Sequence, residues 1–304
     1  MQKIILIAGP TGSGKSEIAL RLARKVDGEI INADSMQVYK EIKTLSARPE
    51  KILNVKHYLY GNVSVKNNFS AGEWLKKVKL NLKKILNRKK TPIFVGGTGL
   101  YFKLLTQGIS NIPKIPDFIR AKARRLNKKL GNDKFYNLLI KLDPLIENKL
   151  KKNDTHRLIR AYEVMVFTKK SLIEWQKNNQ NDFGNYQFIK IYINPENNYL
   201  HNLLRLRLKK MFEFNAISEV KKFYKLKVDK TLPANKILGI EEIKKYLDKK
   251  ISIDQAFEET FIRTRRYVKR QRTWFRGHMK DWISIFHPNF DILTKKIVKL
   301  VTSS

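Results

Sequence analysis

The sequence contains no cysteine. Neither a disulfide framework nor a thiolate metal site can therefore form, which suits a reducing compartment. The sequence also lacks an apolar run long enough to span a bilayer, and its N-terminus enters a strand pattern without the features of a secretory signal. From these absences we expect a cytoplasmic protein that does not act at a membrane.

Acidic residues are scarce relative to basic ones. The 304-residue chain carries 63 Lys and Arg against 27 Asp and Glu, a formal net charge of +36. This excess predicts a polyanionic partner, most simply a nucleic acid. Lys, Asn and Ile are abundant throughout, as AT-rich coding would produce, so part of the lysine excess can be compositional drift. Arginines are therefore the more informative positions.

A glycine-rich stretch near the N-terminus matches the pattern G-x-x-x-x-G-K-[ST]. It reads GPTGSGKS over residues 9–16 and stands between an apolar strand pattern at 3–8 and a helical pattern at 17–23. In such a loop, backbone N–H groups, the helix N-terminus and the lysine converge on one anion. We expect a phosphate or pyrophosphate to bind the following residues: Gly9, Pro10, Thr11, Gly12, Ser13, Gly14, Lys15 and Ser16.

The order of the elements predicts an α/β fold. Apolar strand patterns at 3–8, 29–32 and 92–95 alternate with helices, one of them at 70–88 with a capping-box pattern at its start. This alternation indicates a P-loop NTPase-like parallel sheet flanked by helices. Ligands of such sheets bind beyond the carboxyl ends of the strands. Those ends carry the glycine-rich loop, Asp34-Ser35 and Gly97-Thr98, so we expect all three at one rim.

The middle of the chain has a different pattern. Residues 113–185 show helical periodicity and no strand, which predicts an inserted all-helical domain, with a polar loop at 176–185. The core domain would then comprise 1–112 and 186–304. In its second part we expect a strand at 188–193, followed by helices at 197–225, 239–248 and 253–276.

Asp34 and Thr98 are the candidate reactive side chains at the rim. Taken alone, Asp34 could equally cap the next helix or hold Mg²⁺ through water. Thr98 alone could simply belong to a tight turn after a strand.

Three helical stretches place arginine at positions suited to binding phosphate. Residues 263–276 read RTRRYVKRQRTWFR, and like charges so closely spaced destabilise a helix unless a polyanion lies beside them. Arg157 and Arg160 lie on one face of a second helix that Asp154 or Thr155 caps. Arg207 and Lys210 lie one turn apart on a third.

These residues match a known pattern, and the chain resembles the bacterial tRNA dimethylallyltransferases, also called tRNA isopentenyltransferases, of the IPP transferase family. The resemblance covers nearly the whole chain. Its most specific blocks are DSMQVY at 34–39, GGTGLY at 96–101 and RQRTWFR at 270–276.

The resemblance implies transfer of a dimethylallyl group from dimethylallyl pyrophosphate to N6 of adenosine 37, beside the tRNA anticodon. It implies that Asp34 takes the N6 proton, that Thr98 contacts the reacting centre, and that Arg207 joins the pyrophosphate site. It further implies Mg²⁺ held partly by Ser16, a tRNA anticodon stem-loop as partner, and a monomer. The residues that match tRNA-contacting stretches of the family are Asp34, Ser35, Met36, Gln37, Thr98, Arg120, His156, Arg157, Leu158, Ile159, Arg160, Lys236, Gly239, Lys269, Arg270, Gln271, Arg272, Thr273, Trp274, Phe275 and Arg276.

Three other activities remain open from the residues alone. They are a nucleotide-type P-loop kinase, a nucleic-acid-binding NTPase, and transfer to a free adenine nucleotide as in an adenylate isopentenyltransferase. Two positions also depart from the family pattern, since Gly61 stands where many relatives carry Asp and Ile240 where many carry Tyr.

Overall fold

The computed structural model describes residues 2–49 and 54–303 and contains two compact units. One comprises Met1–Thr106 and Gly184–Ser304, and the other comprises Gln107–Phe183. The second unit therefore begins a few residues before the expected 113–185.

A short ladder accounts for this earlier start. Strand β5 (Ile109–Ser110) pairs antiparallel with β6 (Asn179–Gln180) and brings both ends of the helical unit together. The prediction of a plain loop over 176–185 is wrong at this strand, because backbone pairing with β5 overrides its polar composition.

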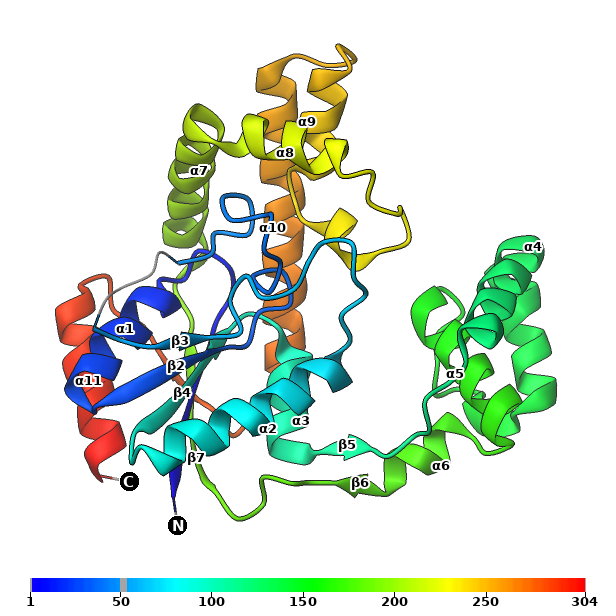
Figure 1. The fold of residues 1–304 in the computed structure, drawn as a ribbon, viewed down its shortest axis with the longest axis horizontal. Helices are drawn as coiled ribbons and strands as arrows, with labels where there is room; N and C mark the ends of the chain where they lie inside the picture. Colours follow the sequence, from blue (N-terminus) through cyan, green and yellow to red (C-terminus); the bar gives the residue numbers. More distant parts are fainter. Residues whose placement is uncertain (1, 50–53, 304) are drawn as a thin grey trace. The chain divides into compact units, whose positions relative to one another are not determined.

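The larger unit is built on a six-stranded parallel sheet, in the order β3-β2-β4-β1-β7-β8 (Figure 1). Strands β1, β2 and β4 are buried along almost their whole length, as the apolar runs of a parallel sheet require. The register places Ala8 opposite Gly96 and Tyr192, so the carboxyl ends of three neighbouring strands share one edge. The strands are β1 (Lys3–Ala8), β2 (Gly28–Asn32), β3 (His57–Tyr58), β4 (Thr91–Gly96), β7 (Gln187–Ile193) and β8 (Ile283–Ile285).

Helices cover both faces of this sheet. On one face, α1 (Lys15–Lys25) and α11 (Phe290–Ser303) bury their apolar residues together against alternate strand side chains (Figure 1). On the other, α2 (Ala71–Asn87) packs with α3 (Gly99–Gln107), and Trp74 stacks on Tyr101 with their ring centroids 4.0 Å apart. The expected capping box at the start of α2 is present.

The C-terminal part of the larger unit adds helices with a core of their own. These are α7 (Asn197–Phe214), α8 (Ala216–Lys225), the 3₁₀ helix η2 (Pro233–Lys236), α9 (Ile240–Leu247) and α10 (Ile253–His278). Their apolar faces meet in one cluster that also takes in Val38, Tyr39 and Ile42 from the segment after β2. The long helix α10 therefore runs from this helical layer to the rim of the sheet (Figure 1).

The helical unit has a separate apolar core. Its elements are α4 (Asp117–Leu142), the 3₁₀ helix η1 (Pro144–Ile146), α5 (Thr155–Thr168) and α6 (Leu172–Lys177), and α4 breaks at Gly131, whose φ is +73°. Phe135 and Leu139 of α4 are fully buried in this core together with Leu158 of α5. Within the described part of the chain, no helix of either unit is both long and apolar enough to cross a bilayer.

Candidate functional site

The glycine-rich loop has the geometry of an anion cradle. Gly12 and Gly14 take φ values of +82° and +80°, in the left-handed region that L side chains rarely adopt, and Gly14 is the N-cap of α1. Ser13 has a buried hydroxyl without a hydrogen-bond partner among the described residues. A buried polar group of this kind is one that a bound phosphate can satisfy.

Lys15 lies inside this cradle. Its side chain is 7% exposed and its Nζ donates to the carbonyl oxygen of Pro10 at 3.1 Å. Burial lowers the pKa of Lys15 to about 8, a shift that Asp34 opposes and Arg207 reinforces. Burial likewise lowers the pKa of Arg207 to about 10, again opposed by Asp34. Two cations and one carboxylate thus interact at the rim, as expected for a site that receives an anion.

Asp34 uses its two carboxylate oxygens differently. Its Oδ1 accepts from the backbone N–H of Met36 at 2.9 Å, which fixes the turn after β2. Its Oδ2 forms no hydrogen bond with the described residues. Asn32 holds the backbone of Asp34 from both sides, since its Oδ1 accepts from Asp34 N at 2.8 Å and its Nδ2 donates to Asp34 O at 2.9 Å. Asp34 is therefore a turn residue with a second oxygen available for chemistry.

Thr98 links the ends of two strands. Its Oγ1 accepts from Ser35 N at 2.9 Å and donates to Ser35 Oγ at 3.2 Å, while its N–H donates to Ala33 O at 3.2 Å. The three segments expected at one rim do meet there. The hydroxyl of Thr98 contacts the segment that carries Asp34.

A pocket of about 690 Å³ opens at this rim. Thr11, Asp34 and Arg207 lie in its wall, and α7, α10 and the segment 230–238 supply most of the rest. Tyr267 of α10 also lines it, and burial, with a contribution from Asp34, raises the pKa of this phenol far above its usual value, so it stays protonated. Lys210, expected one turn from Arg207, is exposed and is not part of the lining.

One wall of the pocket depends on an acid that the sequence did not single out. Glu219 of α8 is 9% exposed, and its carboxylate accepts from the backbone N–H groups of Lys43, Thr44 and Leu45 at 2.6, 2.8 and 2.9 Å. Leu45 lines the pocket. Three long-range contacts to consecutive backbone groups leave no trace in local sequence, so only the structure reveals this role.

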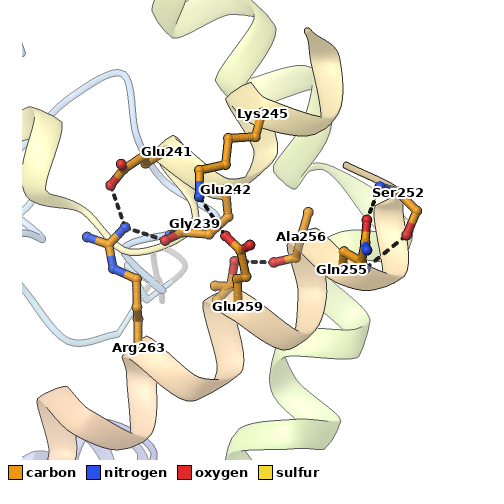
Figure 2. Close-up of polar contacts among 10 residues, drawn as sticks. Gly239, Glu241, Glu242, Lys245, Ser252, Gln255, Ala256, Glu259 and Arg263 are labelled. Carbon is orange, nitrogen blue, oxygen red and sulfur yellow. Dashed lines mark hydrogen bonds and ion pairs between the residues drawn. The ribbon is translucent and has the colours of Figure 1, made fainter. Parts of the chain in front are cut away.

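A second charged cluster, shown in Figure 2, holds the start of α9 against α10. Arg263 Nη1 donates to Glu241 at 2.7 Å and also pairs with the buried carboxylate of Glu242. The other oxygen of Glu242 accepts from Gly239 N at 3.1 Å, where Gly239 has a φ of +95°. The backbone at Gly239, an expected RNA contact, is therefore held in place.

Both departures from the family pattern have structural explanations. Gly61 takes a φ of +57°, and a Cβ there would lie 1.9 Å from Nη1 of Arg48, which donates to Tyr39 O at 2.9 Å. Ile240 is 1% exposed and belongs to the core between α7, α8 and α10. Neither residue disturbs the rim.

The residues of α10 expected to bind RNA do not share one environment. Lys269, Arg270, Thr273 and Arg276 are exposed, whereas the side chains of Gln271 and Phe275 are buried. Arg272 Nη2 donates to Asn194 Oδ1 at 2.7 Å and to Pro195 O at 2.8 Å, so this guanidinium is engaged within the protein. Trp274 stacks on His278 and packs against Gly99. The exposed cations are the ones that an RNA can reach.

The residues of the helical unit that are expected to bind RNA are likewise partly exposed and partly buried. His156 and Arg157 are exposed on α5, and Leu158 is fully buried in the core. Arg160 pairs with the buried Glu163 at 3.5 Å, and burial lowers the pKa of Arg160. The Nε of Arg120 is buried without a hydrogen-bond partner among the described residues. Leu158 is therefore a packing residue, and the arginines provide the polar surface.

The remaining expected contacts fall near the rim. Ser35 and Met36 are half-buried, and Gln37 is buried because its amide donates to the carbonyl oxygens of Ser46 and Ala47 at 3.1 Å each. Lys236 of η2 is exposed and lines the pocket.

Comparison with known proteins gives a consistent assignment. A sequence model of the family described as IPP transferase matches residues 37–278. A tRNA dimethylallyltransferase of Pelagibacter ubique (strain HTCC1062) is 47% identical, covering 98% of this chain and 96% of its own. One of Rickettsia canadensis (strain McKiel) is 40% identical, covering 97% and 91%.

Solved structures of such enzymes are also similar over most of the chain. A tRNA isopentenylpyrophosphate transferase of Bacillus halodurans has a TM-score of 0.72 at 26% identity, covering 100% of this chain and 96% of its own. A eukaryotic dimethylallyltransferase described as acting on tRNA has a TM-score of 0.78 at 26% identity, covering 94% and 74%.

Proposed function

This chain belongs to the IPP transferase family, and on that premise we propose that it transfers a dimethylallyl group from dimethylallyl pyrophosphate to N6 of adenosine 37 in tRNA. Prenyl transfer to tRNA is the activity of its relatives, which it matches over nearly its full length. The observation that carries the detailed proposal is the pocket in which Asp34 lies with the glycine-rich loop and Arg207.

The chemistry needs charge stabilisation above all. The bond between C1 of the prenyl group and the pyrophosphate oxygen breaks, a bond from C1 to N6 forms, and pyrophosphate leaves. An allylic carbon tolerates positive charge, so help at the leaving group lowers the barrier most. The backbone N–H groups of the loop, Lys15 and Arg207 would supply that help.

Asp34 would complete the proton balance. As the new C–N bond forms, N6 becomes positively charged and must lose a proton. The Oδ2 of Asp34 would accept it, while Oδ1 keeps the turn in place. Thr98 would orient this segment at the reacting centre through its contacts with Ser35. The adenine must leave its stack to reach the pocket.

A divalent cation would be held mainly by the substrate. The described residues contain no group of three or more His, Cys, Asp or Glu side chains that could hold a metal. Mg²⁺ does not need such a group, because it commonly binds through few protein oxygens together with substrate phosphates and water. Ser16, in the first turn of α1, would supply one oxygen, and the metal would add positive charge at the leaving group.

Basic residues of both units would bind the anticodon stem-loop. Arg270 and Arg276 on α10, with Arg157 and Arg160 of the helical unit, would bind the same tRNA, so that the helical unit acts as a clamp. A phosphate backbone relieves the repulsion between these closely spaced cations. We further propose that the protein works in the cytoplasm and as a monomer.

One experiment separates this function from its alternatives. The protein is incubated with labelled dimethylallyl pyrophosphate and unmodified tRNA, AMP or no acceptor, and in parallel with ATP and nucleoside monophosphates. We expect label in tRNA, at the N6 of adenosine 37, with release of pyrophosphate. Label in AMP alone would assign an adenylate isopentenyltransferase, and phosphate transfer from ATP alone would assign a kinase.

A further inference from the structure

The side-chain amide of Gln271 bridges two loops of the rim. Its Oε1 accepts from Thr11 N in the glycine-rich loop at 3.0 Å, and its Nε2 donates to Gly97 O in the turn after β4 at 2.8 Å. Both hydrogen bonds join residues that are far apart in the sequence, and Gln271 is 6% exposed. A buried amide that accepts from one group and donates to another fixes the separation of the two groups it joins.

The absence of a side chain at Gly97 makes room for this bridge. A Cβ at Gly97 would lie 2.4 Å from Gln271 Nε2, 3.3 Å from Asp34 Oδ2 and 3.4 Å from Gly9 O. The amide therefore lies between the glycine-rich loop, the turn and the free oxygen of Asp34. No bulkier residue fits at Gly97 without moving one of them.

The neighbours of Gln271 on α10 serve other purposes. Arg270 is exposed and lines the pocket at the rim, while Arg272 donates to the segment after β7. The inward face of α10 is thus fastened beyond the ends of β1, β4 and β7. Its outward face carries Lys269 and Arg276, which are both exposed.

We propose that Gln271 is a positioning residue for prenyl transfer and does not contact tRNA. It holds the loop that receives the pyrophosphate at a fixed distance from the turn whose Thr98 ties down the segment carrying Asp34. It also connects this distance to the helix that presents Arg270 and Arg276. The inference rests on the proposed function, because that function assigns the glycine-rich loop to the pyrophosphate donor and the turn at Thr98 to the tRNA adenosine.

Only a neutral amide makes both hydrogen bonds at neutral pH. A carboxylate at this position accepts from Thr11 N but repels Gly97 O, and it regains the second hydrogen bond only when protonated. Burial next to the carbonyl oxygen of Gly97 favours the protonated form, so its pKa lies above the ordinary value for Glu. Lowering the pH should therefore restore the activity of Gln271→Glu, whereas it should not restore the activity of Gln271→Ala.

The test measures kcat, KM and tRNA Kd for wild type, Gln271→Glu and Gln271→Ala between pH 5.5 and 8.5. Gln255→Glu is the matched control, since it makes the same change at the exposed N-terminal capping box of the same helix. We expect kcat to fall by about 10²-fold in both Gln271 variants at neutral pH, with tRNA Kd within about twofold of wild type. The ratio of Gln271→Glu to wild-type kcat rises as the pH falls, and the Gln271→Ala ratio stays flat.

Two results overturn the inference. One is an unchanged kcat together with a tRNA Kd that rises by the same factor as kcat/KM for tRNA falls, which makes Gln271 an RNA contact. The other is a kcat within threefold of wild type. If Gln271→Glu does not fold, Gly97→Ala displaces the same amide, and an unchanged kcat there has the same meaning. Failure of wild type itself to prenylate tRNA counts against the proposed function and is thereby distinguished from both results.

Discussion

The rim of the sheet and the outward face of α10 use polar side chains in opposite ways. At the rim, Asn32, Thr98 and Gln271 find their partners within the protein, across 2 to 260 positions of sequence. On the outward face, Lys269 and Arg276 are exposed to solvent. Polar groups satisfied internally fix distances, whereas exposed cations gain most from an external polyanion. The rim should therefore control the rate of the reaction and the face should control the affinity for RNA.

The largest effect should come from removing the free oxygen at the rim. Asp34→Asn keeps an oxygen that accepts from Met36 N, and so preserves the turn, but it cannot take the N6 proton. We expect the single-turnover rate to fall by about 10²–10⁴-fold, the usual range for acid–base help. Asp34→Ala, which also removes the hydrogen bond of the turn, is the matched comparison. An Asp34→Asn rate within fivefold of wild type would show that Asp34 serves only the turn.

The rim was largely predictable because its residues follow strand ends. The glycine-rich loop, Asp34 and Thr98 each stand directly after an apolar strand, and parallel strands bring such positions to one edge. The family resemblance then added what these residues would do. The role of Gln271 was not predictable, because α10 reads as one basic helix and nothing local distinguishes a buried amide from its exposed neighbours.

Contacts between distant segments also explain the other differences between the predicted and the observed structure. Leu158 and Phe275 belong to stretches that resemble RNA-contacting segments, but helical periodicity turns them inward to the cores. Strand β6 is polar and short, so only its pairing with β5 defines it. Glu219 and Arg263 act through partners on other elements, which sequence alone does not bring together.

A second effect should follow the charge of Lys15. Its pKa of about 8 in the free protein means that the ammonium form dominates below pH 8 and is lost above it. We expect kcat/KM for the isoprenoid donor to fall about tenfold per pH unit above that value, since kcat/KM reports the free enzyme. Lys15→Arg should remove this limb because the guanidinium stays charged. Lys15→Ala should weaken donor binding more than tRNA binding, and equal weakening of both would contradict the assignment.

A third effect should appear in the salt dependence of tRNA binding. Lys269→Ala with Arg276→Ala should weaken binding of all tRNA sequences and reduce the log–log slope by roughly 0.7–0.9 for each phosphate that the variant no longer neutralises. Lys295→Ala with Lys296→Ala removes the same charge from the exposed face of α11 and should leave the slope unchanged. A slope as steep as wild type in the α10 variant would refute the interface.

Adding Arg157→Ala and Arg160→Ala tests the clamp. The combined decrease in tRNA affinity should depart from the sum of the two double variants if both units bind one RNA. Simple additivity in the quadruple variant would mean that the two sites act independently.

The smallest effect should come from the support of the pocket wall. Glu219→Gln replaces one acceptor oxygen by a donor facing backbone N–H groups, so it should lower the free energy of unfolding by about 1–3 kcal/mol. Donor KM should rise a few-fold while the pH dependence and tRNA Kd stay as in wild type. Glu213→Gln, an exposed position on α7, is the matched control for thermal unfolding. Equal unfolding temperatures for the two variants would show that Glu219 does not hold residues 43–45.

The contrast between rim and face is tested most directly by comparing one variant of each region for both rate and tRNA affinity. Single-turnover rates at saturating enzyme and donor, and tRNA Kd at fixed salt, are measured for Asp34→Asn and for Lys269→Ala with Arg276→Ala. For Asp34→Asn we expect a rate decrease of about 10²-fold or more with a near-normal tRNA Kd. For the α10 double variant we expect a weakened tRNA Kd with a near-normal rate once tRNA is saturating. A decrease of rate and affinity together in both variants would contradict the division of labour between rim and face.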